Sequence, residues 1–117
     1  MPAGIGIDVI EIERIERALE RRPALRERLF TPAELAYADS HQRPGRHLAA
    51  RFAAKEAVIK ALGADGVGPG SIEVVATGGP PEVRLTGAAA EAAGDREISI
   101  SLTHSRETAA AVALAQR

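Results

Sequence analysis

Two carboxylates interrupt otherwise apolar segments of this sequence, and they are its first candidates for chemistry. The first, Asp8, lies in the middle of GIGIDVIEI, where a regular strand would place it on the same face as Ile10 and Ile12. An isolated carboxylate in that position is costly to remove from water, so it normally has a cation, a metal ion or several donors beside it. The alternative is a partly exposed aspartate at a strand bulge next to Gly6.

The second carboxylate, Glu56, belongs to a segment of helical periodicity that also contains two lysines. Lys60 follows Glu56 by four residues, and Lys55 falls inside an apolar stripe. The stripe consists of Leu48, Phe52, Ile59 and Leu62. A Glu–Lys pair at this spacing is usually exposed and merely stabilises its helix, but here it borders the stripe and should be partly covered. For Lys55, either the stem packs while the ammonium reaches water, or the ammonium neutralises a phosphate or a carboxylate.

The available ligands favour magnesium over zinc. The sequence has no cysteine and no histidines clustered at metal-binding spacing. Asp8 and Glu56 suit Mg²⁺, which retains water and takes oxygens from a phosphate substrate. The glycine-rich loop 63–70 could bring backbone amides to a phosphate, but it lacks the lysine and Ser/Thr of a Walker A loop. His104, at the end of an alternating strand, is by itself more typical of a structural histidine than of a ligand.

A predicted helix after the first strand carries charged stripes. Its basic stripe consists of Arg14, Arg17 and Arg21. An acidic stripe beside it consists of Glu13, Glu16 and Glu20. Most helices of this kind are solvated and held by ion pairs; the functional alternative is a docking surface for an acidic partner helix.

The composition restricts the class of protein. With 117 residues, we expect one domain over residues 1–117, whose active site is shallow or shared with a neighbouring subunit. A net charge of -1 and an aromatic content of 3% argue against a nucleic-acid-binding surface. The N-terminus lacks a signal-peptide pattern, and no apolar run is long enough to cross a bilayer. Together with the absence of cysteine, these features predict a cytoplasmic protein that binds neither nucleic acid nor membranes.

Hydrophobic periodicity predicts an α+β fold. We expect a buried strand over 5–12, a helix over 11–22, and a further helix that begins at the N-cap Thr31 with a capping box to Glu34. A basic loop over 39–47 leads to a long helix that ends at Gly63. The C-terminal half predicts a hairpin over 72–76 and 82–85, a short helix ending at Gly94, and strands over 96–104 and 108–115.

Four segments together resemble one known family. They are GIGIDVIEIERIE, RLFTPAELAYA, RFAAKEAVIKALG and ISLTHSRETAAAVALA. In this order they are similar to holo-[acyl-carrier-protein] synthase, the short, stand-alone type of 4′-phosphopantetheinyl transferase, over nearly the whole chain. The loop around Arg43 and residues 87–95 are the least similar stretches, so the resemblance implies no functional role for residues there.

The resemblance implies a reaction and a fold. The reaction moves the phosphopantetheine group of coenzyme A to a serine of apo acyl carrier protein and releases adenosine 3′,5′-bisphosphate, in support of fatty acid or polyketide synthesis. The implied fold is an antiparallel sheet packed against a long helix, assembled as a homotrimer with active sites between subunits.

The resemblance also implies roles for individual residues. Asp8 and Glu56 match the family's magnesium ligands, and Ile10 stands where larger relatives have a third acidic residue. Lys60 matches a lysine that contacts the coenzyme A phosphates. By position, the coenzyme A site also includes Arg51, Gly63 and His104.

The resemblance also assigns a partner to the basic stripe. Arg14, Arg17 and Arg21 lie on the helix that in this family meets the acidic recognition helix of the carrier. The serine proton goes either to Glu56 or to a metal-bound water, and the sequence does not choose between them.

Two other functions are compatible with parts of this pattern. A non-catalytic carrier-binding module would keep the fold and the basic stripe, but it would have little reason to keep Asp8, Glu56 and Lys60 together. Another magnesium-dependent phosphotransferase acting on a small nucleotide has no nucleotide-binding motif to support it.

Overall fold

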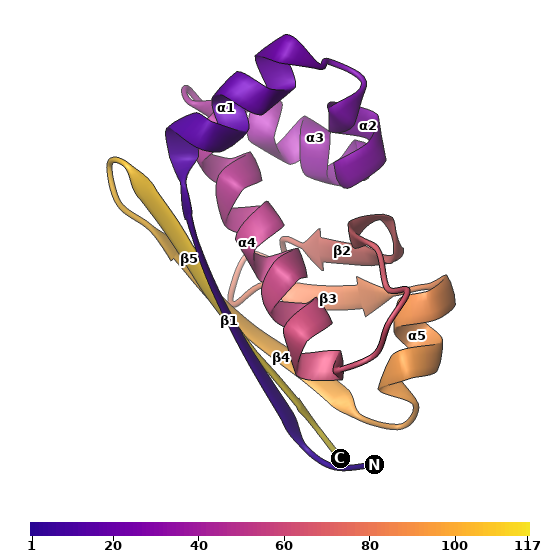
Figure 1. The fold of residues 1–117 in the computed structure, drawn as a ribbon. Coiled ribbons are helices and arrows are strands. Elements are labelled where there is room, and N and C mark those ends of the chain that lie inside the picture. Colours follow the sequence, from indigo (N-terminus) through magenta and orange to yellow (C-terminus); the bar gives the residue numbers. More distant parts are fainter.

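A three-stranded antiparallel sheet carries one long helix along one of its faces. The computed structural model describes all 117 residues. The sheet consists of β1 (Gly4–Glu11), β5 (Thr108–Gln116) and β4 (Glu97–His104), in the order β1-β5-β4. The helix, α4 (Pro44–Leu62), runs along this sheet (Figure 1). The α+β architecture predicted from the periodicity is therefore confirmed.

Small side chains allow the helix to lie close to the sheet. On β5, alternate residues that face α4 are buried alanines: Ala109, Ala111, Ala113 and Ala115. The helix also buries alanines: Ala49, Ala50, Ala53, Ala54, Ala57 and Ala61. This alanine-on-alanine packing explains how a chain with so few aromatic residues forms a core.

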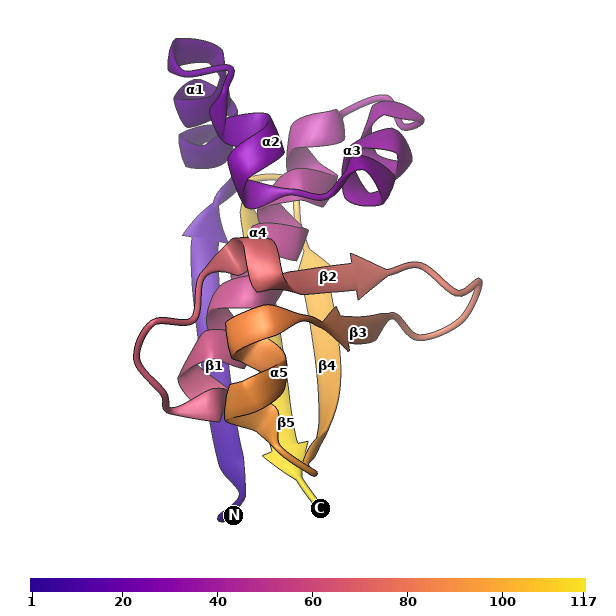
Figure 2. The same cartoon turned by 90° about the vertical axis from the view of Figure 1, so that its right-hand side faces the viewer.

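A second layer covers the other side of α4. It contains a hairpin, β2 (Ile72–Val75) and β3 (Glu82–Leu85), and the short helix α5 (Gly87–Ala93), with a 3-10 turn, η1 (Pro69–Ser71), before the hairpin (Figure 2). Buried Ile72 and Val74 of β2 join the same core cluster as the alanines of α4 and β5. The long helix is thus enclosed between the sheet and the hairpin.

Three shorter helices gather around the N-terminal end of α4 (Figure 1): α1 (Ile12–Arg21), α2 (Leu25–Leu29) and α3 (Pro32–Asp39). The predicted start of α3 is confirmed, because Thr31 and Glu34 form both hydrogen bonds of a capping box around Pro32. Sequence reasoning missed α2, a helix of 5 residues, since so short a segment carries almost no periodicity.

Two predicted boundaries were wrong. The strand ends at Glu11 and Ile12 already starts α1, so the strand does not reach residue 12. The predicted basic loop over 39–47 is shorter, because α4 begins at Pro44 rather than near Leu48. Proline is favoured in the first helical turn, where its missing N–H would have no partner.

The strand β1 is buried on one face only, which corrects the expected buried strand. Gly6 is buried, whereas Ile5, Ile7 and Val9 are 71%, 64% and 63% exposed. Their face of the sheet continues on β5 through Val112, which is paired with Ile7 and is half-buried. One chain alone therefore leaves an apolar sheet surface open. None of the helices combines the length and the apolar character that a membrane crossing requires.

Candidate active site

Two glycines bring β1 into direct contact with α4. A Cβ at Gly4 would collide with the carbonyl oxygen of Ala61, and a Cβ at Gly6 with that of Ala57. Only glycine permits such an approach of strand and helix backbones. Asp8 follows Gly6 by two residues and so points to the same face, toward the helix.

The Asp8 carboxylate faces a lysine of the helix. Lys60 Nζ lies 3.3 Å from Asp8 Oδ1 and donates to the carbonyl oxygen of Ile7 at 2.8 Å. The Asp8 side chain is only 19% exposed. The strand is regular here, with Asp8 paired to Ala111, so the alternative of a bulge is wrong. Of the two alternatives that the sequence left open, the structure shows the carboxylate with a cation beside it.

Glu56 lies close enough to Asp8 for the two negative charges to interact. Burial, followed by the charge of Asp8, raises the pKa of Glu56 above its ordinary value, and Lys60 acts in the opposite direction. Glu56 is half-buried, as expected beside the apolar stripe. The lysine, however, forms its ion pair with Asp8 rather than with Glu56. The site thus holds two carboxylates and one lysine.

The donor set fits a magnesium ion. Two neighbouring carboxylates that repel each other offer hard oxygen ligands, which Mg²⁺ prefers. No group of three or more His, Cys, Asp or Glu residues that could hold a metal occurs in the structure, so protein side chains alone would leave positions for water and phosphate. Ile10, on the same strand face as Asp8, packs against the core instead of supplying a third carboxylate.

A second polar site lies at the other edge of the sheet. A pocket of about 550 Å³ is enclosed by α3, α4, the end of β4 and the turn of the β2–β3 hairpin. Its polar lining includes Tyr37, His47, Arg51 and His104, and Gly78 and Gly79 of the turn also line it. The structure thus brings together Arg51 and His104, two of the residues predicted to contact coenzyme A.

Arg51 is the buried cation of this pocket. The residue is 5% exposed, and its guanidinium lies 4.0 Å from the centre of the Tyr37 ring. Its Nε has no hydrogen-bond partner, and Arg51 forms no ion pair. Burial lowers the pKa of Arg51 from its ordinary value, but a guanidinium remains charged at neutral pH. A buried, unpaired guanidinium in a pocket is suited to binding an anion.

Two histidines, His47 and His104, line the same pocket, and a third, His41, stacks against His47. Sequence reasoning singled out only His104. The His47 ring lies 4.1 Å from that of His41 and 5.5 Å from that of His104, measured between centroids. Burial, together with the neighbouring basic groups, lowers the pKa of His47 to about 4. Burial and Arg46 lower the pKa of His104. His47 was missed because the helix start at Pro44, which places it, was not recognised.

The two sites of one chain are separated by the width of the sheet. Asp8 lies on β1 and His104 on β4, with β5 between them. Two strand spacings correspond to about 10 Å. On α4, Arg51 and Glu56 are five residues apart, so they point to directions roughly 140° apart around the helix axis. We call the group of Asp8, Glu56 and Lys60 the carboxylate site, and the group of Arg51, His47 and His104 the basic pocket.

Gly63 belongs to neither group of side chains. It ends α4 with a left-handed φ of 65° and is exposed. It follows Lys60 by three residues, so it lies at the end of α4 nearest the carboxylate site.

The buried lysine of α4 has a structural partner. Lys55 and Glu34 are both fully buried, and Lys55 Nζ lies 2.7 Å from Glu34 Oε1. The ammonium also donates to the carbonyl oxygen of Leu29 at 2.8 Å, and Glu34 accepts from the Val74 N–H. Lys55 therefore pairs with a carboxylate; neither of the other interpretations, snorkelling to water or neutralising a phosphate, holds.

The basic stripe of α1 faces away from the core. Arg14, Arg17 and Arg21 are exposed, and Arg17 is paired with Glu13 at 2.6 Å, while Arg14 and Arg21 form no ion pair. The helix buries Ile12 and Ile15 on its opposite side. At helical spacing the stripe is therefore available to a partner.

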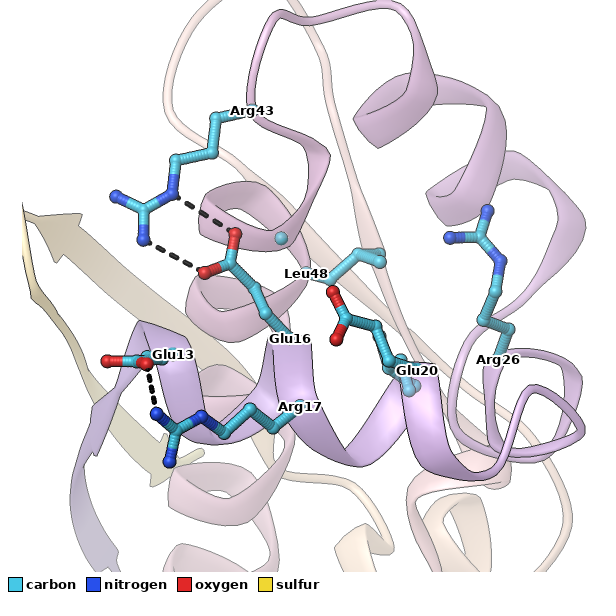
Figure 3. A pocket seen from close by; sticks show the side chains of 9 residues that line it. Glu13, Glu16, Arg17, Glu20, Arg26, Arg43 and Leu48 are labelled. Atoms are coloured by element: carbon cyan, nitrogen blue, oxygen red, sulfur yellow. Dashed lines mark hydrogen bonds and ion pairs between the residues drawn. The ribbon is translucent and has the colours of Figure 1, made fainter.

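The acidic stripe of α1 borders a groove between α1 and α4. Figure 3 shows Arg43, from the segment before α4, with its guanidinium over the Glu16 carboxylate; the Nη2–Oε1 distance is 2.9 Å. Arg43 also donates to the carbonyl oxygen of Arg106 in the β4–β5 turn at 2.7 Å. The acidic stripe is thus partly used to attach α1 to the rest of the molecule.

The family is decided by comparison with known proteins. A model of the 4′-phosphopantetheinyl transferase superfamily matches residues 4–114. The chain belongs to this superfamily. It is 52% identical to the holo-[acyl-carrier-protein] synthase of Moorella thermoacetica, over 95% of this chain and 91% of that protein. It is 47% identical to the holo-[acyl-carrier-protein] synthase of Streptomyces coelicolor, over 97% and 96% of the two chains.

Solved structures of the superfamily share the fold. A complex of the Chronobacterium ammoniagenes ACPS with CoA matches with a TM-score of 0.85 at 30% identity, over 99% of this chain and 98% of that chain. The Mycobacterium tuberculosis acyl carrier protein synthase matches with a TM-score of 0.80 at 43% identity, over 97% and 96%. The antiparallel sheet packed against a long helix, which the resemblance implies, is therefore confirmed.

Proposed function

We infer that this chain transfers the 4′-phosphopantetheine group of coenzyme A to a serine of an apo acyl carrier protein. The observation that carries this inference is the carboxylate site, Asp8, Glu56 and Lys60, in a chain of this superfamily. The serine oxygen bonds to the phosphorus next to pantetheine, the bridging P–O bond breaks, and adenosine 3′,5′-bisphosphate leaves. The serine gives up its proton in the same process.

We propose that Asp8 and Glu56 hold Mg²⁺. When bound, the ion would neutralise the diphosphate and stabilise the charge that develops on the leaving phosphate. Two carboxylates that repel each other, with a raised pKa at Glu56, support this assignment. Among the protein's own groups, the Glu56 carboxylate is also the one suited by its raised pKa to accept the serine proton.

Lys60 supplies a positive charge to the carboxylate site. Its ammonium pairs with Asp8 and donates to the Ile7 carbonyl oxygen, yet more than half of the side chain is exposed. It can therefore turn from Asp8 to a phosphate oxygen without leaving the site. Gly63, at the end of the same helix, leaves its backbone open to a diphosphate on this side.

We propose that the basic pocket binds the nucleotide end of coenzyme A. Arg51 and His104 line it, no ion pair occupies Arg51, and its volume of about 550 Å³ is adequate for a nucleotide-sized group. A Helicobacter pylori holo-[acyl-carrier-protein] synthase of the same fold, 26% identical with a TM-score of 0.83, is known in complex with coenzyme A.

The distance between the two sites suggests how they cooperate. We propose a homotrimer in which the carboxylate site of one subunit meets the basic pocket of the next, because both lie at the edges of one sheet. The open apolar surface of Ile5, Ile7 and Val9 adjoins the β1 edge, and burying it would favour assembly.

Arg14, Arg17 and Arg21 would contact the carrier. An exposed basic stripe complements an acidic helix and guides its approach more than it raises affinity. The cytoplasmic location stays a prediction from the sequence.

The experiment that tests the reaction is direct. The chain is incubated with Mg²⁺, coenzyme A and an apo carrier protein, and the carrier is weighed by mass spectrometry. The expected result is a carrier heavier by one phosphopantetheine, with stoichiometric release of adenosine 3′,5′-bisphosphate. A carrier that keeps its mass, for every fatty-acid and polyketide carrier tried, would contradict the assigned reaction.

A further inference from the structure

The basic pocket contains more basic groups than a phosphate contact by Arg51 and His104 requires. His47 lies in the first turns of α4, and its ring is surrounded by other basic or aromatic groups. From its own helix these are Arg46 and Arg51; from α3 and the turn after it, Tyr37 and His41; from β4, His104.

No carboxylate is among the groups that face His47. Every charged group that acts on its pKa is basic. Arg46 and Arg51 form no ion pairs, and both have a buried Nε without a hydrogen-bond partner. Arg51 is more than nine-tenths buried and lines the same pocket. Such an excess of positive charge around a buried guanidinium favours neutral imidazoles or a bound anion.

We propose that His47 is a proton-linked binding group for the ribose phosphate of coenzyme A, so that the imidazole takes up a proton when this phosphate dianion occupies the pocket. This inference rests on the function proposed above and adds a residue to its substrate site. The phosphate supplies the negative charge that the pocket lacks. The imidazolium then donates a second N–H, either to the phosphate or to His41.

Phosphate binding and protonation of His47 favour each other. In the free protein, burial and the surrounding cations hold the pKa of His47 near 4, so the ring is neutral at pH 7. The bound dianion favours the charged ring and raises that pKa. Binding is then accompanied by proton uptake, and affinity increases as pH falls, by at most tenfold per pH unit for one proton.

The phosphate titrates in the same range, with a second pKa of about 6, and this must be separated from His47. Protonation of the ligand in solution is the same for every protein variant. The ratio of the affinities of wild type and a His47 variant therefore isolates the histidine. His47→Phe keeps an aromatic ring in contact with His41 and His104, while His47→Gln keeps a hydrogen-bonding group; neither side chain titrates.

Calorimetry with adenosine 3′,5′-bisphosphate, without metal or carrier, tests the proposal. Titrations between pH 8 and pH 5.5, in buffers of different ionisation enthalpy, give both affinity and proton uptake. Adenosine 5′-monophosphate, which lacks the ribose phosphate, is the matched ligand. The wild type is expected to take up more protons with the bisphosphate than with the monophosphate, and both His47 variants are expected to lose this excess. Their affinity relative to wild type should fall as the pH is lowered.

Two negative results of this experiment would have different meanings. If the wild type does not bind the bisphosphate at any pH, the nucleotide site of the proposed function is wrong. If it binds, but with equal proton uptake for both ligands or with uptake that persists in both variants, only the role of His47 is overturned. Histidine Cε1–Hε1 NMR shifts give a second readout, because the chain has three histidines. A His47 signal that still titrates near pH 4 in the complex would also contradict the proposal.

Discussion

At the scale of single residues, the chemistry of the site depends on where charged side chains lie and on what surrounds them. Asp8 and Glu56 interact across the contact of β1 with α4, and Lys60 pairs with the aspartate from 52 residues away in sequence. Each group is unremarkable alone, but together they form a site that repels additional negative charge unless a cation is bound. This arrangement makes Glu56 the most informative position for mutation.

We predict that Glu56→Gln loses turnover while the fold survives. The substitution keeps the size of the side chain but removes the proposed metal ligand and proton acceptor, so we expect turnover to fall by about 100-fold or more. Thermal unfolding in a chelator measures the fold, and the carrier mass assay measures turnover. Undiminished turnover would refute the assignment of Glu56 to the site.

The same variant tests the raised pKa of Glu56. Between its ordinary value near 4.5 and the raised value, the folded protein binds more protons at this group than the unfolded chain. The free energy of unfolding should therefore decrease as pH rises through this window. Without metal, Glu56→Gln should lack this decrease, so its stability relative to wild type increases from pH 4 to pH 7. Parallel stability curves would contradict the raised pKa.

At the scale of elements, the contact of β1 with α4 and the outer face of α1 are the features with functional consequences. Much of this level could be predicted from the sequence. The capping box at Thr31, the hairpin and the alternation of β4 are local signals, and all were confirmed. The partner of Lys55 could not be predicted, because Glu34 lies 21 residues away in sequence. The local sequence around Glu34 indicated only its role in the capping box at Thr31.

We predict that Gly6→Ala damages both stability and activity. A Cβ at this position meets the carbonyl oxygen of Ala57, so β1 must move away from α4 and carry Asp8 with it. We expect a loss of about 1–3 kcal/mol in urea unfolding, with lower turnover. Gly68→Ala is the matched control, since a Cβ there has nothing within 4 Å and φ is -99°. Equal effects of the two substitutions would show that the close approach does not matter.

We predict that reversing charge on the basic stripe weakens carrier binding and spares coenzyme A. Arg14→Glu and Arg21→Glu, tested singly, should each raise the KM for the carrier by about tenfold at low salt, less at high salt, because exposed charges are screened. Arg117→Glu makes the same charge change at the opposite end of the molecule (Figure 1). If all three variants raise the KM equally, net charge rather than the stripe is responsible.

At the scale of the whole molecule, one chain carries the carboxylate site and the basic pocket at opposite edges of a sheet. The three residues of the carboxylate site, Asp8, Glu56 and Lys60, were candidates from the sequence, as were Arg51 and His104 of the basic pocket, whereas His47 was missed. The sequence could not show that these residues separate into two groups, because this follows from the strand order β1-β5-β4 and from the directions of side chains around α4. The exposed face of Ile5, Ile7 and Val9 was misjudged for a related reason: alternation indicates an apolar face but not what covers it.

The most direct test is complementation between two inactive variants. Glu56→Gln disables the carboxylate site and Arg51→Ala the basic pocket. The two are mixed in equal amounts, dissociated and reassembled, and carrier modification is measured. In a cyclic trimer with shared sites, three quarters of the assemblies are mixed and each has one intact site of three, so activity should return to about a quarter of wild type. Reassembled mixtures that stay as inactive as the separate variants would contradict an active site completed by a neighbouring subunit.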